Sequence, residues 1–176
     1  DVRALAPGTI VLADLLAFAV KSSIDLLVEL KDASAAEPVG LAIAAHVHAA
    51  RIVVGSFHGP ALAAVKTVAP ALRTSYMMGS VAGPAELIGL AAAFRSDGVH
   101  LCWESRAPRP HRLLDRAAID ALRGAGLAVT LWHEERIDEL LALVALGPDA
   151  ICTNTPAVLR HIVDSHHAEP ARAGQS

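Results

Sequence analysis

The sequence predicts a parallel α/β protein built as one domain. Six short runs rich in β-branched residues recur along its 176 residues, and stretches rich in Ala and Leu separate them. Hydrophobic residues make up 53% of the chain and charged residues 19%, which is typical of a folded domain rather than a disordered segment. The length also favours a single domain.

The predicted strands follow one another along the chain. They are expected at Ile24–Leu30, Arg51–Phe57, Arg73–Met78, Gly98–Trp103, Leu127–Trp132 and Ala150–Thr153. Helical stretches separate the strands, and a single crossover helix returns the chain to the same end of the sheet. Strands connected in this way run parallel and are covered by helices. Periodicity leaves two arrangements open, an open doubly wound sheet and part of an eight-stranded barrel.

The predicted helices have recognisable starts and ends. Pro60 and Pro156 suit a first helical turn, while Gly124 and Gly147 suit a helix end. Between these signals, apolar residues recur at steps of three and four. The clearest helices are expected at Leu12–Val20, Pro60–Val68, Leu113–Arg123, Ile137–Leu146 and Pro156–Val163.

The predicted domain covers residues 1–165 and is followed by a short disordered tail, residues 166–176. The tail is polar and contains the adjacent pair His166 and His167, which we interpret as part of a frayed end. The chain begins with Asp1 and shows no export signal. We therefore expect a cytoplasmic protein from which an N-terminal part is missing.

Several classes of function and partner are disfavoured. The 15 basic and 18 acidic residues give a formal charge of −3 without a basic stripe, so nucleic acid is not expected as a partner. Charged or polar residues interrupt every long apolar stretch, so no membrane span is expected. No glycine-rich phosphate-binding motif occurs. Cys102 and Cys152 lie in apolar strand-like runs and are interpreted as free thiols.

The first strand ends in a charged pair. Side chains alternate along a strand, so Asp25, Leu27, Glu29 and Lys31 share one face. Ligands of parallel α/β proteins gather at the carboxyl ends of strands, where Glu29 and Lys31 lie. Glu29 suits a divalent cation and Lys31 a phosphoryl oxygen. The spacing alone also allows an ordinary charged strand end that faces solvent.

Four segments resemble the glycerophosphodiester phosphodiesterase family, in the family's order. The first is Leu27-Val28-Glu29-Leu30-Lys31, similar to the family's strand ending in E-I-K, and the second is Val54-Gly55-Ser56-Phe57. The third is Ala125 to Trp132, similar to the strand that ends in W-T-V-N. The fourth, Gly147 to Pro156, is similar to the closing G-V-D-g-I-x-T-D-x-P.

The resemblance implies a partial TIM (β/α)8 barrel made of strands three to eight, since complete barrels have about 250 residues. It implies a metal-dependent hydrolase that splits a small-molecule glycerophosphodiester into glycerol 3-phosphate and an alcohol. By the same resemblance Glu29 binds the metal, Ca²⁺ or Mg²⁺, and Lys31 is catalytic beside the phosphate. Trp132 and Phe57 contact the substrate.

The chain departs from the family pattern in several places. The family's His-Arg-Gly motif, its Glu-x-Asp pair and its second histidine have no match, so no histidine here is assigned a catalytic role. The W-T-V-N segment becomes Trp132-His133-Glu134-Glu135, and T-D-x-P becomes Thr153-Asn154-Thr155-Pro156. Both changes bear on substrate choice more than on the fold.

The alternative interpretation is a truncated, non-catalytic barrel fragment that acts as a binding or assembly module. A six-stranded open sheet has two unpaired edges, which favour homo-oligomers or aggregation. Three further residues are weaker candidates for the site. Glu104 and Arg106 follow the fourth predicted strand, where they could contact an anionic or polyol substrate, and His58 follows the second.

Overall fold

The protein was analysed as a computed structural model, which describes residues 8–102 and 107–173, with side chains described to His167. Six strands alternate with helices along this part of the chain. The strands are β1 (Leu26–Glu29), β2 (Ile52–Ser56), β3 (Arg73–Met78), β4 (Gly98–Cys102), β5 (Ala128–Trp132) and β6 (Ala150–Ile151). The α-helices are α2 (Leu12–Ser22), α3 (Ala36–Ala44), α4 (Gly59–Val68), α5 (Pro84–Ala93), α6 (Arg116–Gly124), α7 (Ile137–Leu146) and α8 (Pro156–Ala173). Short 3₁₀ turns are η1 (Ala33–Ala35), η2 (Ala49–Arg51) and η3 (Pro110–Arg112).

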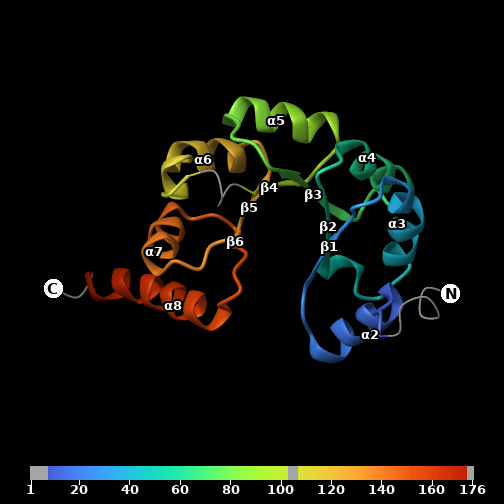
Figure 1. Ribbon diagram of the computed structural model, residues 1–176, viewed down its shortest axis with the longest axis horizontal. Helices are drawn as coiled ribbons and strands as arrows, with labels where there is room; N and C mark the ends of the chain where they lie inside the picture. The colour runs from blue at the N-terminus through green and yellow to red at the C-terminus, as the bar shows by residue number, and fades with distance from the viewer. Residues whose placement is uncertain (1–7, 103–106, 174–176) are drawn as a thin grey trace.

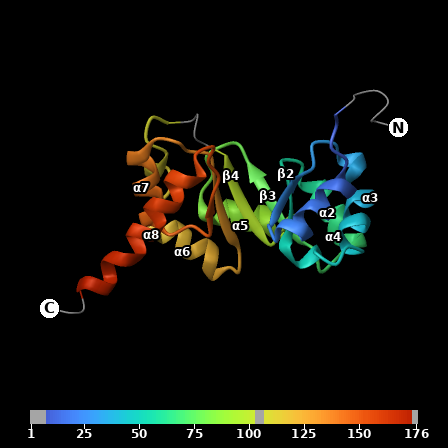
Figure 2. The same cartoon turned by 90° about the horizontal axis from the view of Figure 1, so that it is seen from below.

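The six strands form one parallel sheet in the order β1-β2-β3-β4-β5-β6. Because neighbours in the sheet are also neighbours in the sequence, the strand order never reverses and the doubly wound alternative is excluded. The sheet curls into a half-barrel with the helices on its outer side (Figure 1). A view from below shows the same curved sheet between its two groups of helices (Figure 2). The predicted partial TIM barrel is therefore confirmed.

The hydrophobic core lies between the convex face of the sheet and the helices. One cluster joins the first strands to α2, α3 and α4, with Ile52, Val54 and Leu62 fully buried. A second joins β4 and β5 to α5 and α6, with Val99 and Ile119 fully buried. Since side chains alternate along each strand, the intervening residues face the concave side.

Small residues occupy much of the concave side. Gly55, Gly98, Ala128 and Ala150 lie there, and a Cβ added to Gly98 would stand 2.8 Å from the carbonyl oxygen of Ala128. A sheet that curls inward brings its inner side chains together, so small residues on that face permit the curvature.

An aspartate before β4 and another before β6 attach each strand to the preceding one. The Asp97 carboxylate accepts a hydrogen bond from the Thr74 N–H at 2.7 Å, and the Asp149 carboxylate accepts one from the Val129 N–H at 2.8 Å. Burial raises the pKa of Asp149, but hydrogen bonds from Arg123 and Val129 and the charge of Arg123 outweigh it, so the pKa is lowered overall. The two residues fix the strand register in the same way.

The element bounds differ from the sequence predictions at both strand and helix ends. β1 covers only Leu26–Glu29 of the predicted Ile24–Leu30, and β6 only Ala150–Ile151 of the predicted Ala150–Thr153. α6 begins at Arg116 rather than Leu113, because Asp115 caps it by accepting a hydrogen bond from the Ala118 N–H. α8 continues to Ala173 and so passes residue 165, where the predicted domain ends. Among the described residues, no helix combines the length and hydropathy that a bilayer crossing requires.

Candidate functional site

Glu29 is positioned by the alternation of side chains in β1. Leu26 and Val28 pack with the helices in the first core cluster, whereas Leu27 and Glu29 are more exposed on the opposite face. Leu27 lies close to Gly55 on the concave side. Glu29 therefore occupies the carboxyl end of β1 on the concave face, as its place in the sequence predicts.

Glu29 and Lys31 form a loose ion pair at this strand end. The Lys31 Nζ lies 3.8 Å from the Glu29 Oε2. The Lys31 side chain is 82% exposed and that of Glu29 is 31% exposed, so the contact adds little to stability. Both charged groups are accessible to a ligand from solvent, and an anionic group could replace the carboxylate as the partner of Lys31.

Ser56 holds the ends of β1 and β2 together. Its fully buried hydroxyl donates a hydrogen bond to the Leu30 carbonyl at 2.8 Å and accepts one from the His58 N–H at 3.0 Å. The Leu30 N–H also donates to the Gly55 carbonyl at 2.8 Å. These bonds fix the backbone at Leu30, between Glu29 and Lys31, and at His58, next to Phe57.

Phe57 and Trp132 meet across the concave side. Their ring centroids lie 6.4 Å apart at an interplanar angle of 58°. Trp132 also stands edge-on to His100, with centroids 6.3 Å apart. Phe57 remains 44% exposed, so these rings offer an apolar surface to a ligand. The structure thus brings together the two predicted substrate-contact residues, which are 75 positions apart in the sequence.

The two segments that depart from the family motifs contact one another. The Glu135 carboxylate accepts hydrogen bonds from the Asn154 side-chain amide at 2.8 Å and the Asn154 N–H at 3.2 Å. The family motifs have an amide at the position of Glu135 and a carboxylate at the position of Asn154. One amide and one carboxylate are therefore still present, in exchanged places.

Glu134 is held beside this pair by Arg136. The Arg136 guanidinium donates to both Glu134 oxygens, at 2.9 and 2.6 Å. Burial raises the pKa of the Glu134 carboxyl, but the bonds from Arg136 and from backbone N–H groups outweigh it, so the pKa is lowered overall. The Glu134 carboxylate is therefore charged, and both of its oxygens already accept hydrogen bonds from Arg136. This makes it a poor candidate for a catalytic base.

The fold has close counterparts among solved structures. A phosphodiesterase from Oleispira antarctica, solved with the product sn-glycerol-3-phosphate, superposes with a TM-score of 0.68 at 18% identity, covering 87% of this chain and 60% of that one. A glycerophosphodiester phosphodiesterase from Parabacteroides distasonis also gives 0.68, at 18% identity, covering 89% of this chain and 64% of that one. The chain has the fold of these phosphodiesterases. It spans less than two thirds of their length.

One further solved structure is similar to the chain, whereas the sequence comparisons found no match. A protein from Galdieria sulphuraria assigned to the glycerophosphodiester phosphodiesterases gives a TM-score of 0.71 at 21% identity, covering 87% of this chain and 63% of that chain. No protein-family model and no curated protein matches the sequence. The resemblance seen in the sequence motifs is therefore confirmed at the level of the phosphodiesterase fold.

The described residues do not by themselves form a complete site for Ca²⁺ or Mg²⁺. Such ions take six or more oxygen ligands in proteins, or keep part of their water shell. Among the residues described, no group of three or more His, Cys, Asp and Glu side chains could hold an ion. Glu29 supplies one carboxylate that suits such an ion.

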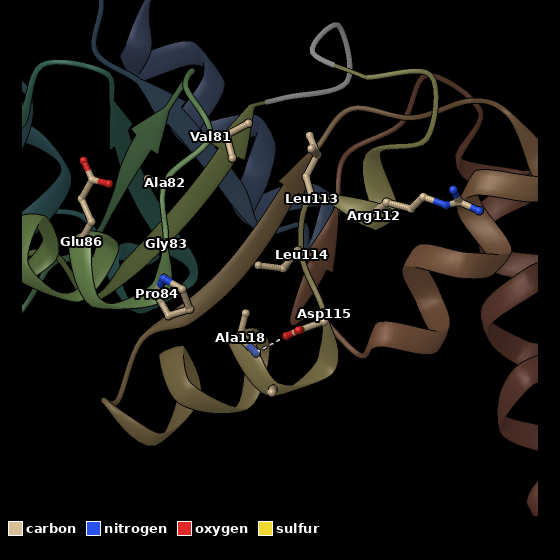
Figure 3. Close-up of a pocket in the computed structure, with 11 residues that line it drawn as sticks. Val81, Ala82, Gly83, Pro84, Glu86, Arg112, Leu113, Leu114, Asp115 and Ala118 are labelled. Atoms are coloured by element: carbon tan, nitrogen blue, oxygen red, sulfur yellow. Dashed lines mark hydrogen bonds between the residues drawn. The ribbon is translucent and has the colours of Figure 1, made fainter.

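Two further cavities lie away from the predicted site residues, none of which lines either cavity. One of about 270 Å³ lies on the concave face and is lined by Leu27, Thr130 and Cys152 among others. The other, of about 570 Å³, opens between the segments that lead into α5 and α6 (Figure 3). In that view Glu86 and Arg112 point away from each other, and Leu113 and Leu114 lie between them. None of the predicted site residues lines the second cavity.

Sequence analysis missed two features of the site. His100 was assigned no role, yet it lies on the concave face next to Trp132 and is only 1% exposed. The Glu135–Asn154 contact was also missed, because it joins the segments that follow β5 and β6. The alternation of side chains in β4 was the signal that could have placed His100 inward. Glu104 and Arg106 lie outside the described residues.

Proposed function

We propose that this chain is part of a phosphodiester hydrolase that acts on glycerophosphodiesters and releases glycerol 3-phosphate and an alcohol. The observation that carries the proposal is the position of Glu29 and Lys31. They end β1 on the concave face of a barrel whose fold matches solved phosphodiesterases, one of which holds sn-glycerol-3-phosphate. Active sites of such barrels lie at the carboxyl ends of the strands.

Each residue has a defined part in the proposal. Lys31 would neutralise the charge that develops on the phosphoryl oxygens. Phe57 and Trp132 would contact the apolar part of the substrate, because their rings form one surface across the concave side. Glu29 would be one ligand of a divalent cation, Ca²⁺ or Mg²⁺, which polarises phosphoryl oxygens when bound. The remaining oxygen ligands would come from outside the described residues.

Replacing Glu29 by glutamine is expected to abolish metal-dependent hydrolysis in a protein that carries this chain within a complete barrel. The amide keeps the size of the side chain but removes the charge that a hard cation prefers. Release of glycerol 3-phosphate from a glycerophosphodiester measures the effect, and circular dichroism checks the fold. Glu86→Gln, an exposed change on α5, is the matched control and should leave the rate within twofold. An unchanged rate for Glu29→Gln would refute the assignment.

A second candidate function is a non-catalytic binding or assembly module. The chain spans less than two thirds of the solved phosphodiesterases, and β1 and β6 each pair with one neighbour only within the described sheet. Apolar side chains are exposed at or near the β1 edge, including Ile24 at 39% and Leu27 at 44%. Unpaired parallel edges with exposed apolar residues favour pairing with another chain.

The second candidate predicts self-association of this chain. Size-exclusion chromatography with light scattering at micromolar concentration should give the mass of two or more chains. Leu27→Lys should shift the protein toward monomer, because lysine on an edge strand opposes pairing. Leu41→Lys, at a residue 54% exposed on α3, is the control and should change nothing. A monomer in the unmodified chain would exclude the assembly function.

A further inference from the structure

The concave face is hollowed at the amino ends of the strands, at the opposite end of the sheet from the proposed hydrolytic site. This cavity measures about 270 Å³, and residues of all six strands line it. The proposed hydrolysis makes no use of it, because that reaction belongs to the carboxyl ends of the strands. We call this cavity the inner hollow, and the residues that matter for its chemistry are Leu27, Val53, Ser75, Gly98, Ala128 and Thr130.

A row of small residues across the sheet leaves the inner hollow open. Gly55, Ser75, Gly98 and Ala128 are neighbours in the strand register, so no side chain larger than that of serine stands in this row. Protein interiors are normally filled by side chains at high density. Since Ser75 has a glycine on either side, no neighbouring side chain of the row covers its hydroxyl group.

The Ser75 hydroxyl is a buried polar group without a partner. Ser75 is only 6% exposed, and its side chain has no hydrogen-bond partner within the described part of the chain. Leaving a buried hydroxyl unpaired costs free energy, and native proteins seldom do so. Thr130, half-buried on the same face, offers a second hydroxyl that is likewise unpaired among the described residues. A molecule in the inner hollow would supply the missing hydrogen bond.

We propose that the inner hollow binds a small neutral molecule that has an apolar body and one hydrogen-bonding group. Small-molecule sites are mostly apolar, with a few polar groups that fix the orientation of the ligand. Leu27 and Val53 contact the apolar body, and Ser75 and Thr130 bind the polar group. An apolar cavity of about 150 Å³ holds one benzene molecule, so the inner hollow suits a body of roughly nine or ten non-hydrogen atoms.

The charged groups around the inner hollow favour a neutral ligand. The carboxylates of Asp25 and Asp97, which line it, are each paired with a cation, Arg51 and Lys66 respectively. No unpaired carboxylate is therefore left among the described lining residues to receive an amine. Arg73 is exposed and donates to a carbonyl of η2, so a ligand anion would gain little from it. A charge placed deeper, against the apolar lining, would be costly.

Titration of the 176-residue chain with indole, a neutral bicyclic molecule of this size with one N–H donor, tests the proposal. Amide NMR spectra should show saturable shifts at lining residues such as Gly98 and Ala128. Ser75→Ala should weaken indole binding about 3- to 10-fold, the effect of one lost hydrogen bond. The same change should leave the binding of indene, which has the shape of indole without the N–H, within about twofold. Ser80→Ala, at an exposed serine after β3, is the matched control and should change neither.

Four results would overturn the proposal. The first is an absence of saturable shifts, or shifts that lie outside the inner hollow. The second is equal weakening of indole and indene by Ser75→Ala, and the third is tighter binding of indole-2-carboxylate than of indole. The fourth is indole binding that weakens as the protein concentration rises, which would mean that a second copy of the chain covers the hollow. The location of the shifts is measured on the unmodified chain, so it decides the matter even if a variant fails to fold.

Discussion

Replacing Asp97 by alanine is expected to lower the free energy of unfolding by about 2 to 4 kcal/mol. The Asp97 carboxylate receives the Lys66 Nζ at 2.6 Å and the Thr74 N–H at 2.7 Å. The Lys66 side chain is only 9% exposed. Alanine would leave that ammonium with the Pro70 carbonyl, at 3.3 Å, as its remaining hydrogen-bond acceptor, and would leave the Thr74 N–H without its carboxylate.

The expected loss of stability is large because the Lys66 side chain is buried. Asp97 itself is 45% exposed, so solvent screens part of the interaction and the loss stays below that of a fully buried pair. Asp97→Asn should cost less than Asp97→Ala, because its side-chain oxygen can still accept from Thr74. Adding Lys66→Met to Asp97→Asn should restore part of the stability, since it removes the unpaired buried charge.

Chemical denaturation followed by circular dichroism measures these changes. The control is Asp120→Ala, which breaks an exposed pair with Arg116 on α6, where the side chains are 58% and 62% exposed. That change should stay within about 0.5 kcal/mol. Equal effects of Asp97→Ala and Asp120→Ala would show that the buried lysine does not depend on Asp97.

The order and type of the elements could be predicted from local sequence patterns, but the curvature of the sheet could not. The expected bounds of β3 and α7 match the structure residue for residue, because clear turn signals flank both. Periodicity assigns faces to each strand but carries no information on how far a sheet curls. The small inward residues Gly55, Gly98 and Ala128 permit the curvature, and their shared face becomes evident only once the strand register is known.

The candidate site was predictable where it lies within one strand. The alternation in β1 predicts the inward position of Glu29, which the structure confirms, whereas the parts assigned to Glu29 and Lys31 stay predictions. Contacts between different elements were not predictable, because each depends on how the elements pack against one another. Asp97 with Lys66 and Glu135 with Asn154 both join residues at least 19 positions apart in the sequence.

His100 is expected to make the protein lose stability as the pH falls from about 6.5 to about 4. Burial lowers the pKa of this imidazole from 6.5 to about 4. In that window the unfolded chain binds a proton that the folded chain does not, so acidification favours unfolding. The contribution is complete above pH 6.5 and is lost progressively toward pH 4. Its full size is roughly 3 kcal/mol, from about 1.4 kcal/mol per pKa unit.

Among the residues that the structure describes, the neighbours of His100 offer no compensating negative charge in this window. Burial raises the pKa of the Cys152 thiol, which therefore stays neutral, and Trp132 presents an uncharged ring. The lowered carboxyl pKa values of Asp149 and Glu134 act in the same direction but at more acidic pH, below their ordinary values of 3.8 and 4.5. The two effects can thus be separated by the pH at which each appears.

Denaturation curves of the unmodified chain and of His100→Gln, measured between pH 7.5 and 4.5, provide the test. Glutamine does not titrate, so the free energy of unfolding should fall less steeply with acidification in the variant. The variant should be the less stable protein at pH 7, and the difference should shrink as the pH decreases. His58→Gln, which changes a histidine in the exposed loop after β2, is the control and should follow the unmodified chain. Parallel curves for His100→Gln and the unmodified chain would mean that His100 is protonated in the folded protein as readily as in the unfolded one.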